Sequence, residues 1–128
     1  MKMVGLNVAA DPIYTFAYLG INGGMVFVSA DDPGMHSSQN EQDNRNYAKN
    51  MKIAMFEPSD SQESLDMVKE AYRVSEEYTV PVMLRMTTRV CHSKSLVAEQ
   101  TRQEVQATPY VKERDKMDAV PAISKYAK

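Results

Sequence analysis

The chain has 128 residues, of which 43% are hydrophobic and 25% are charged, and its formal net charge is −2. This length allows one small domain, and the slight negative charge excludes the basic surface by which proteins bind nucleic acids or anionic membranes. A single cysteine, Cys91, cannot form an internal disulfide, a zinc site or an iron–sulfur cluster, which indicates a reducing cytoplasm. No apolar run is long enough to span a bilayer.

The first predicted elements are a loop at residues 4–7 and a helix that ends at Leu19. Asp11 can cap this helix, and Pro12 can occupy its first position, where the missing N–H does no harm. Gly20 then stops the helix and begins a turn.

A buried strand is predicted next, because residues 25–30 form a continuous apolar run with β-branched side chains. Residues 31–34, DDPG, mark the loop that follows it. Ser38 and Glu41 have the spacing of a capping box, which predicts a short polar helix that continues to about Asn50.

Two further strands are predicted on either side of an amphipathic helix. The apolar run at residues 53–56 indicates the first of them. Asp60 and Glu63 again have capping-box spacing, and the apolar positions after them share one face of a helix over residues 60–78. Residues 82–88 predict the third strand.

Strands that alternate with helices predict parallel βαβ units, so the expected fold class is α/β, with a parallel sheet covered by helices. The expected domain covers residues 1–95, and the charged, glutamine-rich residues 96–128 predict a linker or an irregular C-terminal tail. Ligands of such sheets bind beyond the carboxyl ends of the strands, here residues 31–32, 57–58 and 88–89.

Two polar segments at these strand ends are candidates for a functional site. His36 lies in a polar loop after a buried strand, which is a common place for function, although such a loop can also simply turn the chain and cap a helix. Arg89, close to His92, could hold a carboxylate through two parallel hydrogen bonds, or it could pair with a neighbouring acid. Asp31, Asp32 and His36 alone would make a poor set of ligands for a metal ion.

Read as a string, residues 30–43, ADDPGMHSSQNEQD, resemble the signature stretch of the alpha subunit of indolepyruvate:ferredoxin oxidoreductases. The flanking segments that agree with this family in order and spacing are residues 4–12, 57–63, 81–85 and 88–93. The resemblance is close over residues 1–95 and looser beyond them. It implies an incomplete thiamine-diphosphate pyrimidine-binding domain, of which this chain is the later part.

The resemblance also implies a chemistry. The family oxidatively decarboxylates indolepyruvate and other arylpyruvates to an aryl-acetyl-coenzyme A. Thiamine diphosphate and magnesium lie between two domains of the alpha subunit, and electrons pass through iron–sulfur clusters to ferredoxin. A smaller beta subunit completes the enzyme. The cofactor supplies the carbanion stabilisation, and the protein supplies orientation and electrostatics.

Carried onto this sequence, the resemblance places Gly5, Leu6 and Asn7 in the loop that approaches the aminopyrimidine of the cofactor. It places Asp31 where related pyruvate enzymes have a substrate-binding arginine, so that role does not transfer to this chain. The residues that we expect in the wall of the arylpyruvate pocket are Asp31, Asp32, His36, Ser37 and Arg89.

The chain also departs from the family pattern. It has no Gly-Asp-Gly-type motif for magnesium and diphosphate and no cysteine clusters, and the activating glutamate of the family would lie upstream of Gly5. We therefore assign no catalytic residue and no metal ligand. We expect no cofactor and no oxidoreductase activity on this chain alone, and we expect partners in the remainder of the alpha subunit, the beta subunit and ferredoxin.

Two alternatives belong to other functional classes. The chain could be a structural or interaction module that forms a homo-oligomer through an exposed sheet edge. It could also be a small independent enzyme that uses Arg89, His92 and Asp31.

Overall fold

The computed structural model describes residues 1–102, 104–107 and 109–112. Within this part of the chain, three parallel strands form one sheet in the order β1-β3-β2, with β1 at Val26–Asp31, β2 at Met55–Phe56 and β3 at Val82–Thr87. Helices connect successive strands, as parallel pairing requires. The expected α/β class with a parallel, helix-covered sheet is confirmed, and the three strands lie within one or two residues of their predicted ends.

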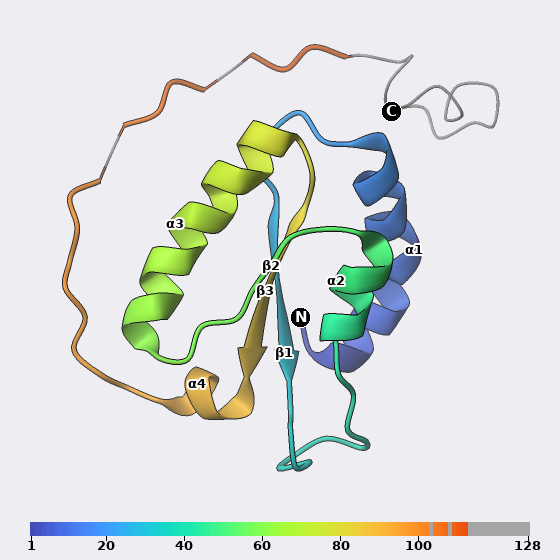
Figure 1. Ribbon diagram of the computed structural model, residues 1–128, viewed down its shortest axis with the longest axis vertical. Helices are drawn as coiled ribbons and strands as arrows, with labels where there is room; N and C mark the ends of the chain where they lie inside the picture. The colour runs from blue at the N-terminus through green and yellow to red at the C-terminus, as the bar shows by residue number, and fades with distance from the viewer. Residues whose placement is uncertain (103, 108, 113–128) are drawn as a thin grey trace.

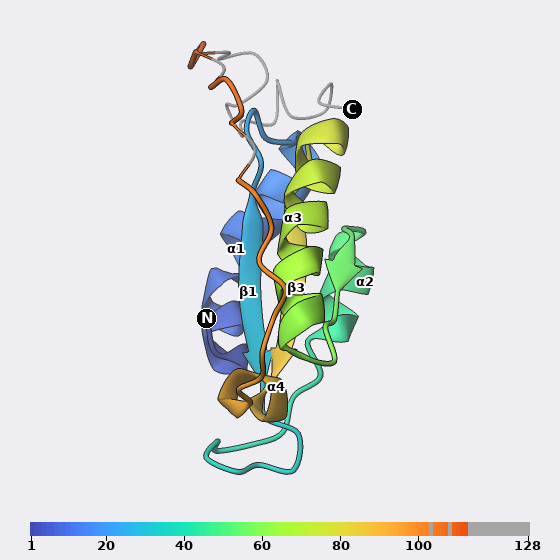
Figure 2. The ribbon, with the colours of Figure 1, turned by 90° about the vertical axis from the view of Figure 1, so that its left-hand side faces the viewer.

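Helices cover both faces of the sheet. α1 (Met3–Leu19) and α2 (Arg45–Met51) lie on one side of the strands, and α3 (Ser61–Tyr78) lies on the other (Figure 1). A short helix, α4 (Thr88–His92), follows β3 directly. Figure 2 shows α4 beside the loop that joins β1 to α2, and both lie at the carboxyl end of β1.

The face of the sheet that α1 and α2 cover changes in character along the strands. Phe27 pairs with Met83, and two residues further on Ser29 pairs with Arg85, so these side chains share one face. The apolar pair belongs to the hydrophobic core, whose buried members are Leu6, Ile13, Phe27, Ala48, Met51 and Met83. Toward the carboxyl ends this apolar surface gives way to a buried polar one, because Ser29 and Arg85 are also buried.

α1 begins earlier than the sequence predicts. Residues 4–7 are helical rather than a loop, and Pro12 lies inside the helix rather than at its start. A proline inside a helix costs about 3 kcal/mol. Met3 and Leu6 are completely buried, and the burial of such a side chain contributes about 1.5–3 kcal/mol. The burial of the two side chains together therefore contributes about as much as the proline costs, or more.

α2 begins at Arg45 rather than near Ser38, so the predicted capping box is wrong. The carboxylate of Glu41 instead accepts a hydrogen bond from the backbone N–H of Gly34 at 3.3 Å. The segment before Arg45 consequently remains a loop, which continues from the end of β1 to Asn44.

α3 is confirmed over almost its whole predicted length. Asp60 caps it, because its carboxylate accepts a hydrogen bond from the N–H of Glu63 at 2.8 Å. The side chain of Glu63 in turn accepts from the N–H of Ser59 at 2.8 Å, one residue before the position that a capping box uses. Thr79, in a left-handed conformation with φ 54°, ends the helix.

The described part of the predicted tail contains neither helix nor strand. It runs beside α3, where Ala98 N–H donates to Gln62 and the Gln100 amide donates to Asp66, at 2.7 and 2.8 Å. Residues 103, 108 and 113–128 lie outside the described residues, so the division at residue 95 stays a prediction. No helix in the described ranges has both the length and the apolar character needed to cross a membrane.

Candidate functional site

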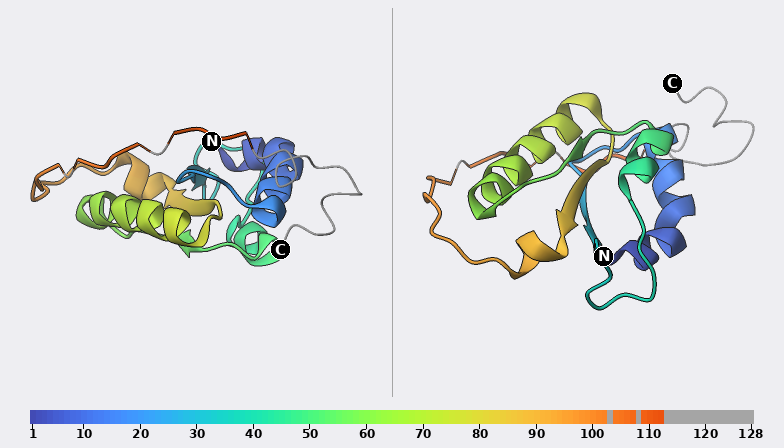
Figure 3. Two further views of the ribbon diagram at one scale, coloured as in Figure 1. Left: turned by 90° about the horizontal axis from the view of Figure 1, so that it is seen from above. Right: turned by 60° about the horizontal axis from the view of Figure 1, so that its bottom comes forward.

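A cavity of about 810 Å³ lies at the carboxyl end of the sheet, where the loop after β1 meets the end of β3 and α4. Figure 3 shows this end of the molecule in its right-hand view. The residues that line the cavity are Pro33, His36, Ser37, Thr87, Thr88, Arg89 and His92. The position agrees with the rule that ligands of parallel sheets bind beyond the carboxyl ends of the strands.

Three of the five residues expected in a substrate pocket line this cavity together. His36 and Ser37 come from the loop after β1, and Arg89 comes from α4, more than fifty positions later in the chain. His92, for which the sequence offered a role only in the alternative of an independent enzyme, also lines the cavity. Arg89 and both histidines are exposed, so their side chains are available to a ligand.

Asp32 connects the loop after β1 to α4, the two segments that line the cavity, but does not line the cavity itself. Its carboxylate accepts a hydrogen bond from the N–H of Ser37 at 2.8 Å and another from the hydroxyl of Thr88 at 2.7 Å. These donors hold the pKa of Asp32 well below its usual value, with the Ser37 N–H making the largest contribution. Asp32 therefore remains ionised at neutral pH and ties the loop to α4.

Thr88, the first residue of α4, bonds to the segment at the end of β1. Its hydroxyl lies 3.2 Å from the carbonyl oxygen of Asp31 and donates to Asp32. Both contacts join the start of α4 to the last residue of β1 and the residue after it. Because Arg89 follows directly, this crosslink determines where the arginine enters the cavity.

Asp31 points into the protein rather than into the large cavity. It is only 1% exposed, and its Oδ2 accepts from the Nε of Arg85 at 2.8 Å and from the N–H of Asn44 at 3.0 Å. Its Oδ1 is buried and has no hydrogen-bond partner. Asp31 also borders a smaller cavity of about 170 Å³, which includes Lys2 and His92 among its lining residues.

Arg85 is the residue of this site that the sequence analysis missed. It is 4% exposed and forms ion pairs with Asp31 and with Glu57. Its guanidinium also lies 4.0 Å from Asp43. The signal was present in the sequence, because a charged side chain in the middle of the apolar strand VMLRM must find a partner if it is buried.

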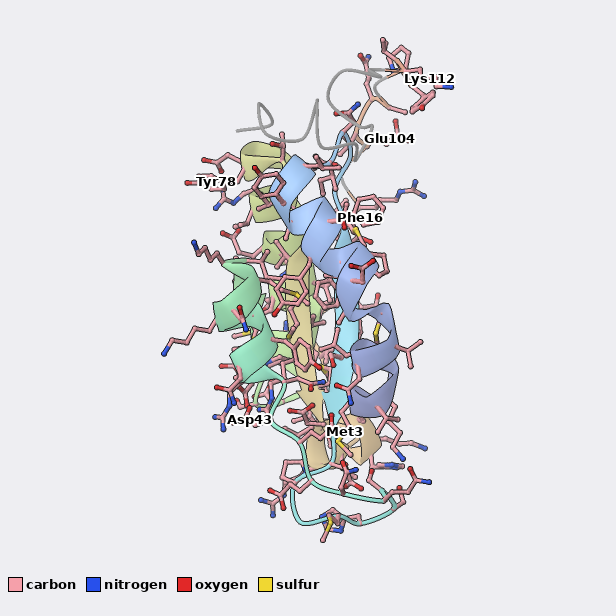
Figure 4. The ribbon with its side chains drawn as sticks, turned by 90° about the vertical axis from the view of Figure 1, so that its right-hand side faces the viewer. Met3, Phe16, Asp43, Tyr78, Glu104 and Lys112 are labelled. Atoms are coloured by element: carbon pink, nitrogen blue, oxygen red, sulfur yellow. The ribbon has the colours of Figure 1, made fainter. Side chains whose placement is uncertain are left out.

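Asp43 lies just before α2, and Figure 4 labels it on the side of that helix. Arg45 donates two hydrogen bonds to its carboxylate, at 2.8 and 2.7 Å. This contact lowers the pKa of Asp43 to about 2, with a smaller contribution from the charge of Arg85. The end of the loop is therefore anchored by a carboxylate that stays ionised.

Gly5, Leu6 and Asn7 do not form the loop that was expected to face a cofactor. They lie in the first turns of α1, and the side chain of Leu6 is completely buried in the core. The amide of Asn7 is exposed but engaged, because it donates to Gln42 at 3.0 Å and accepts from the Tyr47 hydroxyl at 2.6 Å. In this arrangement the buried side chain of Leu6 does not fit a cofactor contact.

Comparison with known proteins gives the same result as the residue pattern. A family model described as pyruvate flavodoxin/ferredoxin oxidoreductase, thiamine diphosphate-binding, matches residues 28–125. The indolepyruvate oxidoreductase subunit IorA of Methanothermobacter marburgensis is 48% identical over 126 residues, which are 98% of this chain and 20% of the relative.

Two other relatives carry the same name. The protein from Archaeoglobus fulgidus is 54% identical over 97 residues, covering 76% of this chain and 16% of the relative. The protein from Pyrococcus horikoshii is 56% identical over 94 residues, covering 73% of this chain and 14% of the relative. The chain thus spans about a fifth or less of the length of these relatives. No solved structure matches it.

The family model covers well over half of the chain, and the parallel sheet with its helices agrees with an incomplete domain of this kind. The chain therefore belongs to the family of thiamine-diphosphate-binding domains of the pyruvate flavodoxin/ferredoxin oxidoreductases.

Proposed function

We propose that this chain forms one wall of the active site of a thiamine-diphosphate-dependent oxidoreductase that converts indolepyruvate and other arylpyruvates to aryl-acetyl-coenzyme A. On this proposal the electrons pass through iron–sulfur clusters of another domain to ferredoxin, and a beta subunit takes part. The reaction takes place in the cytoplasm. The chain alone binds no cofactor and has no activity. The observation that carries the proposal is the cavity that brings His36, Ser37 and Arg89 together at the carboxyl end of the sheet.

The chemistry of this cavity suits an aromatic 2-oxo acid. Arg89 offers a guanidinium that can bind a carboxylate through two parallel hydrogen bonds. The ring of Pro33 and the methyl groups of Thr87 and Thr88 offer apolar surface to an aromatic group. A volume of about 810 Å³ lies in the range of about 300–1,000 Å³ that small-molecule sites occupy.

His36 and Ser37 complete the polar part of this wall. Both can hydrogen-bond the keto or carboxylate oxygens of a bound substrate, and Asp32 holds Ser37 in place through its backbone N–H. Arg89 supplies the positive charge of this wall, and among the described residues no acid forms an ion pair with it. We assign no proton transfer to His36 or Ser37.

Thiamine diphosphate, when bound with magnesium, supplies the carbanion stabilisation that decarboxylation needs. In the described part of the chain, no group of three or more acidic, histidine or cysteine side chains is placed to hold a metal ion. On our proposal the groups that hold magnesium and diphosphate belong to other parts of the enzyme, and this chain binds and orients the substrate.

The experiment is substitution of Arg89 by glutamine in the assembled oxidoreductase that contains this chain. Loss of a charge-assisted contact worth about 1.5–3 kcal/mol is expected to raise KM for indolepyruvate about 10- to 100-fold, with a smaller change in kcat. The matched control is Arg73→Gln, because within the described residues Arg73 forms ion pairs with Glu70 and Glu77 alone, on the exposed face of α3. An unchanged KM in Arg89→Gln would refute the substrate-binding role.

A second candidate function is self-association, which the exposed apolar residues favour. α1 contains one charged residue, Asp11, and exposes Val8, Phe16 and Tyr18 at 86%, 42% and 51%. β1 is the outermost strand of the sheet, and Met1 and Lys2 already pair with Val28 and Ala30 along its edge. The side chain of Val28 is 43% exposed. Helices that are apolar on all sides are normally covered by other protein.

Sedimentation of the purified chain distinguishes self-association from a surface that the rest of the enzyme covers. If copies of the chain associate through α1, Val8→Lys should convert a concentration-dependent dimer to a monomer. The control Gln39→Lys adds the same charge in an exposed loop and should leave the dimer intact. A monomer at all concentrations before any substitution would exclude this candidate.

A further inference from the structure

Arg85 occupies an unusual place in the sheet. It lies on the central strand β3, on the face that α1 and α2 cover, two residues beyond the core residue Met83. Its side chain is 95% buried. A guanidinium in such a place must be compensated by acids and hydrogen-bond acceptors, and those partners come from separate segments of the chain.

The partners of Arg85 lie at both ends of one loop. Asp31 is the last residue of β1, immediately before the loop of residues 32–44, and it accepts from Arg85 Nε at 2.8 Å. Asp43 lies at the other end of this loop, 4.0 Å from the guanidinium. Glu57, just after β2, accepts a hydrogen bond from Nη1. Figure 4 shows Asp43 near the carboxyl ends of the strands.

Asp31 links Arg85 to the far end of the loop. The oxygen that accepts from Arg85 also accepts the N–H of Asn44 at 3.0 Å, and the Asn44 amide donates to the hydroxyl of Ser29. Asn44 is completely buried. Both ends of the loop are therefore joined at a single carboxylate, whose position is set by Arg85.

The loop that is closed in this way carries His36 and Ser37, which line the large cavity. Arg85 itself is not among the lining residues. Arg85 therefore does not contact a ligand in this cavity, and it acts on the cavity through the position of the loop.

We propose that Arg85 is a positioning residue of the cavity: by pairing with Asp31, Glu57 and Asp43 it holds the loop of residues 32–44 in the conformation that presents His36 and Ser37 to the substrate. This inference rests on the proposed function for the identity of the ligand. The holding of the loop does not depend on that identity and can be tested separately.

The first experiment measures amide hydrogen exchange at single residues in the full chain. Arg85→Lys keeps the charge but loses the planar set of donors, and we expect the N–H groups of Asn44 and Ser37 to exchange at least tenfold faster. The N–H groups in the middle of α3 should change less than twofold, which separates loop release from general destabilisation. Arg73→Lys, the same change on a surface salt bridge, should leave the loop unchanged.

Arg85→Met is the stronger variant. If it folds, the loop should exchange faster still. If it does not fold, Arg85→Lys decides the question. Unchanged protection of Asn44 and Ser37 in Arg85→Lys would overturn the proposal, and so would a uniform increase in exchange across α3 and the loop.

The second experiment measures steady-state kinetics of the assembled enzyme with Arg85→Lys. Release of the loop should raise KM for indolepyruvate about fivefold or more, with kcat changed less than twofold. If the loop exchanges faster but KM is unchanged, Arg85 still positions the loop, and the proposal that the loop takes part in substrate binding is refuted. A raised KM with an unchanged loop would refute the positioning role of Arg85, while the Arg89 test decides the proposed function independently.

Discussion

The two halves of one sheet face are built by opposite means. Toward the amino ends of the strands, Phe27 and Met83 pack against α1 and α2 in an apolar core. Toward the carboxyl ends, the same face carries Ser29, Asp31 and Arg85, equally buried but joined by hydrogen bonds and ion pairs. The apolar half stabilises the fold without directional contacts. The polar half is held by hydrogen bonds and ion pairs, whose strength depends on their direction. Such contacts suit the end of the sheet where a loop must be held in one conformation.

The largest expected effect is the removal of the charge in the polar half. Arg85→Met leaves the buried Asp31 without its partner, and breaking a buried ion pair costs about 3–5 kcal/mol. Urea unfolding followed by circular dichroism measures this change. The double variant Arg85→Met/Asp31→Leu removes both charges and should recover part of the loss. A double variant that is less stable than the sum of the single changes would argue against a direct pair.

The matched change in the apolar half is Met83→Ala, two residues away on the same face of β3. Met83 is completely buried, and such truncations cost about 2–5 kcal/mol. The same urea titration applies. Because no directional contact is lost, Met83→Ala should lower stability without selectively increasing amide exchange in the loop. Selective release of the loop by this variant would remove the distinction between the two halves.

A smaller effect is expected at the cap of α3, which lies outside both halves. Asp60→Ala removes the hydrogen bond to the N–H of Glu63, and loss of such a cap costs about 1 kcal/mol. Thermal unfolding should show a lower Tm. Asp60→Asn keeps an acceptor at the cap position and should retain most of the stability. Equal losses in the two variants would show that the cap bond itself contributes little.

The smallest expected effect is on the stability of the fold at acidic pH. Arg45 lowers the pKa of Asp43 to about 2 in the folded state, whereas an unfolded aspartate has a pKa of about 3.9. The pair therefore contributes stability above pH of about 4, and this contribution is lost as the pH falls toward about 2. Asp43→Asn should flatten the pH dependence of stability in this window, measured by urea unfolding at each pH. An unchanged profile would place the acid sensitivity elsewhere in the chain.

The local sequence determined the elements that have their own short-range signals. α3 was predicted from Asp60, Glu63 and its apolar face, and the three strands were predicted from apolar runs. The position of the cavity followed from a general property of parallel sheets. His36, Ser37 and Arg89 could be grouped because each follows a strand end and belongs to a segment that resembles one family.

Tertiary structure decided the rest, because long-range contacts outweighed local preference. The burial of Met3 and Leu6 extends α1 through Pro12, against the proline signal. Glu41 bonds to Gly34 instead of Ser38 and leaves a loop where a helix was predicted. The two acids that accept hydrogen bonds from Arg85 lie 28 and 54 positions away in the chain. No local pattern links residues so far apart, so only the folded sheet shows that Asp31 faces inward, toward Arg85.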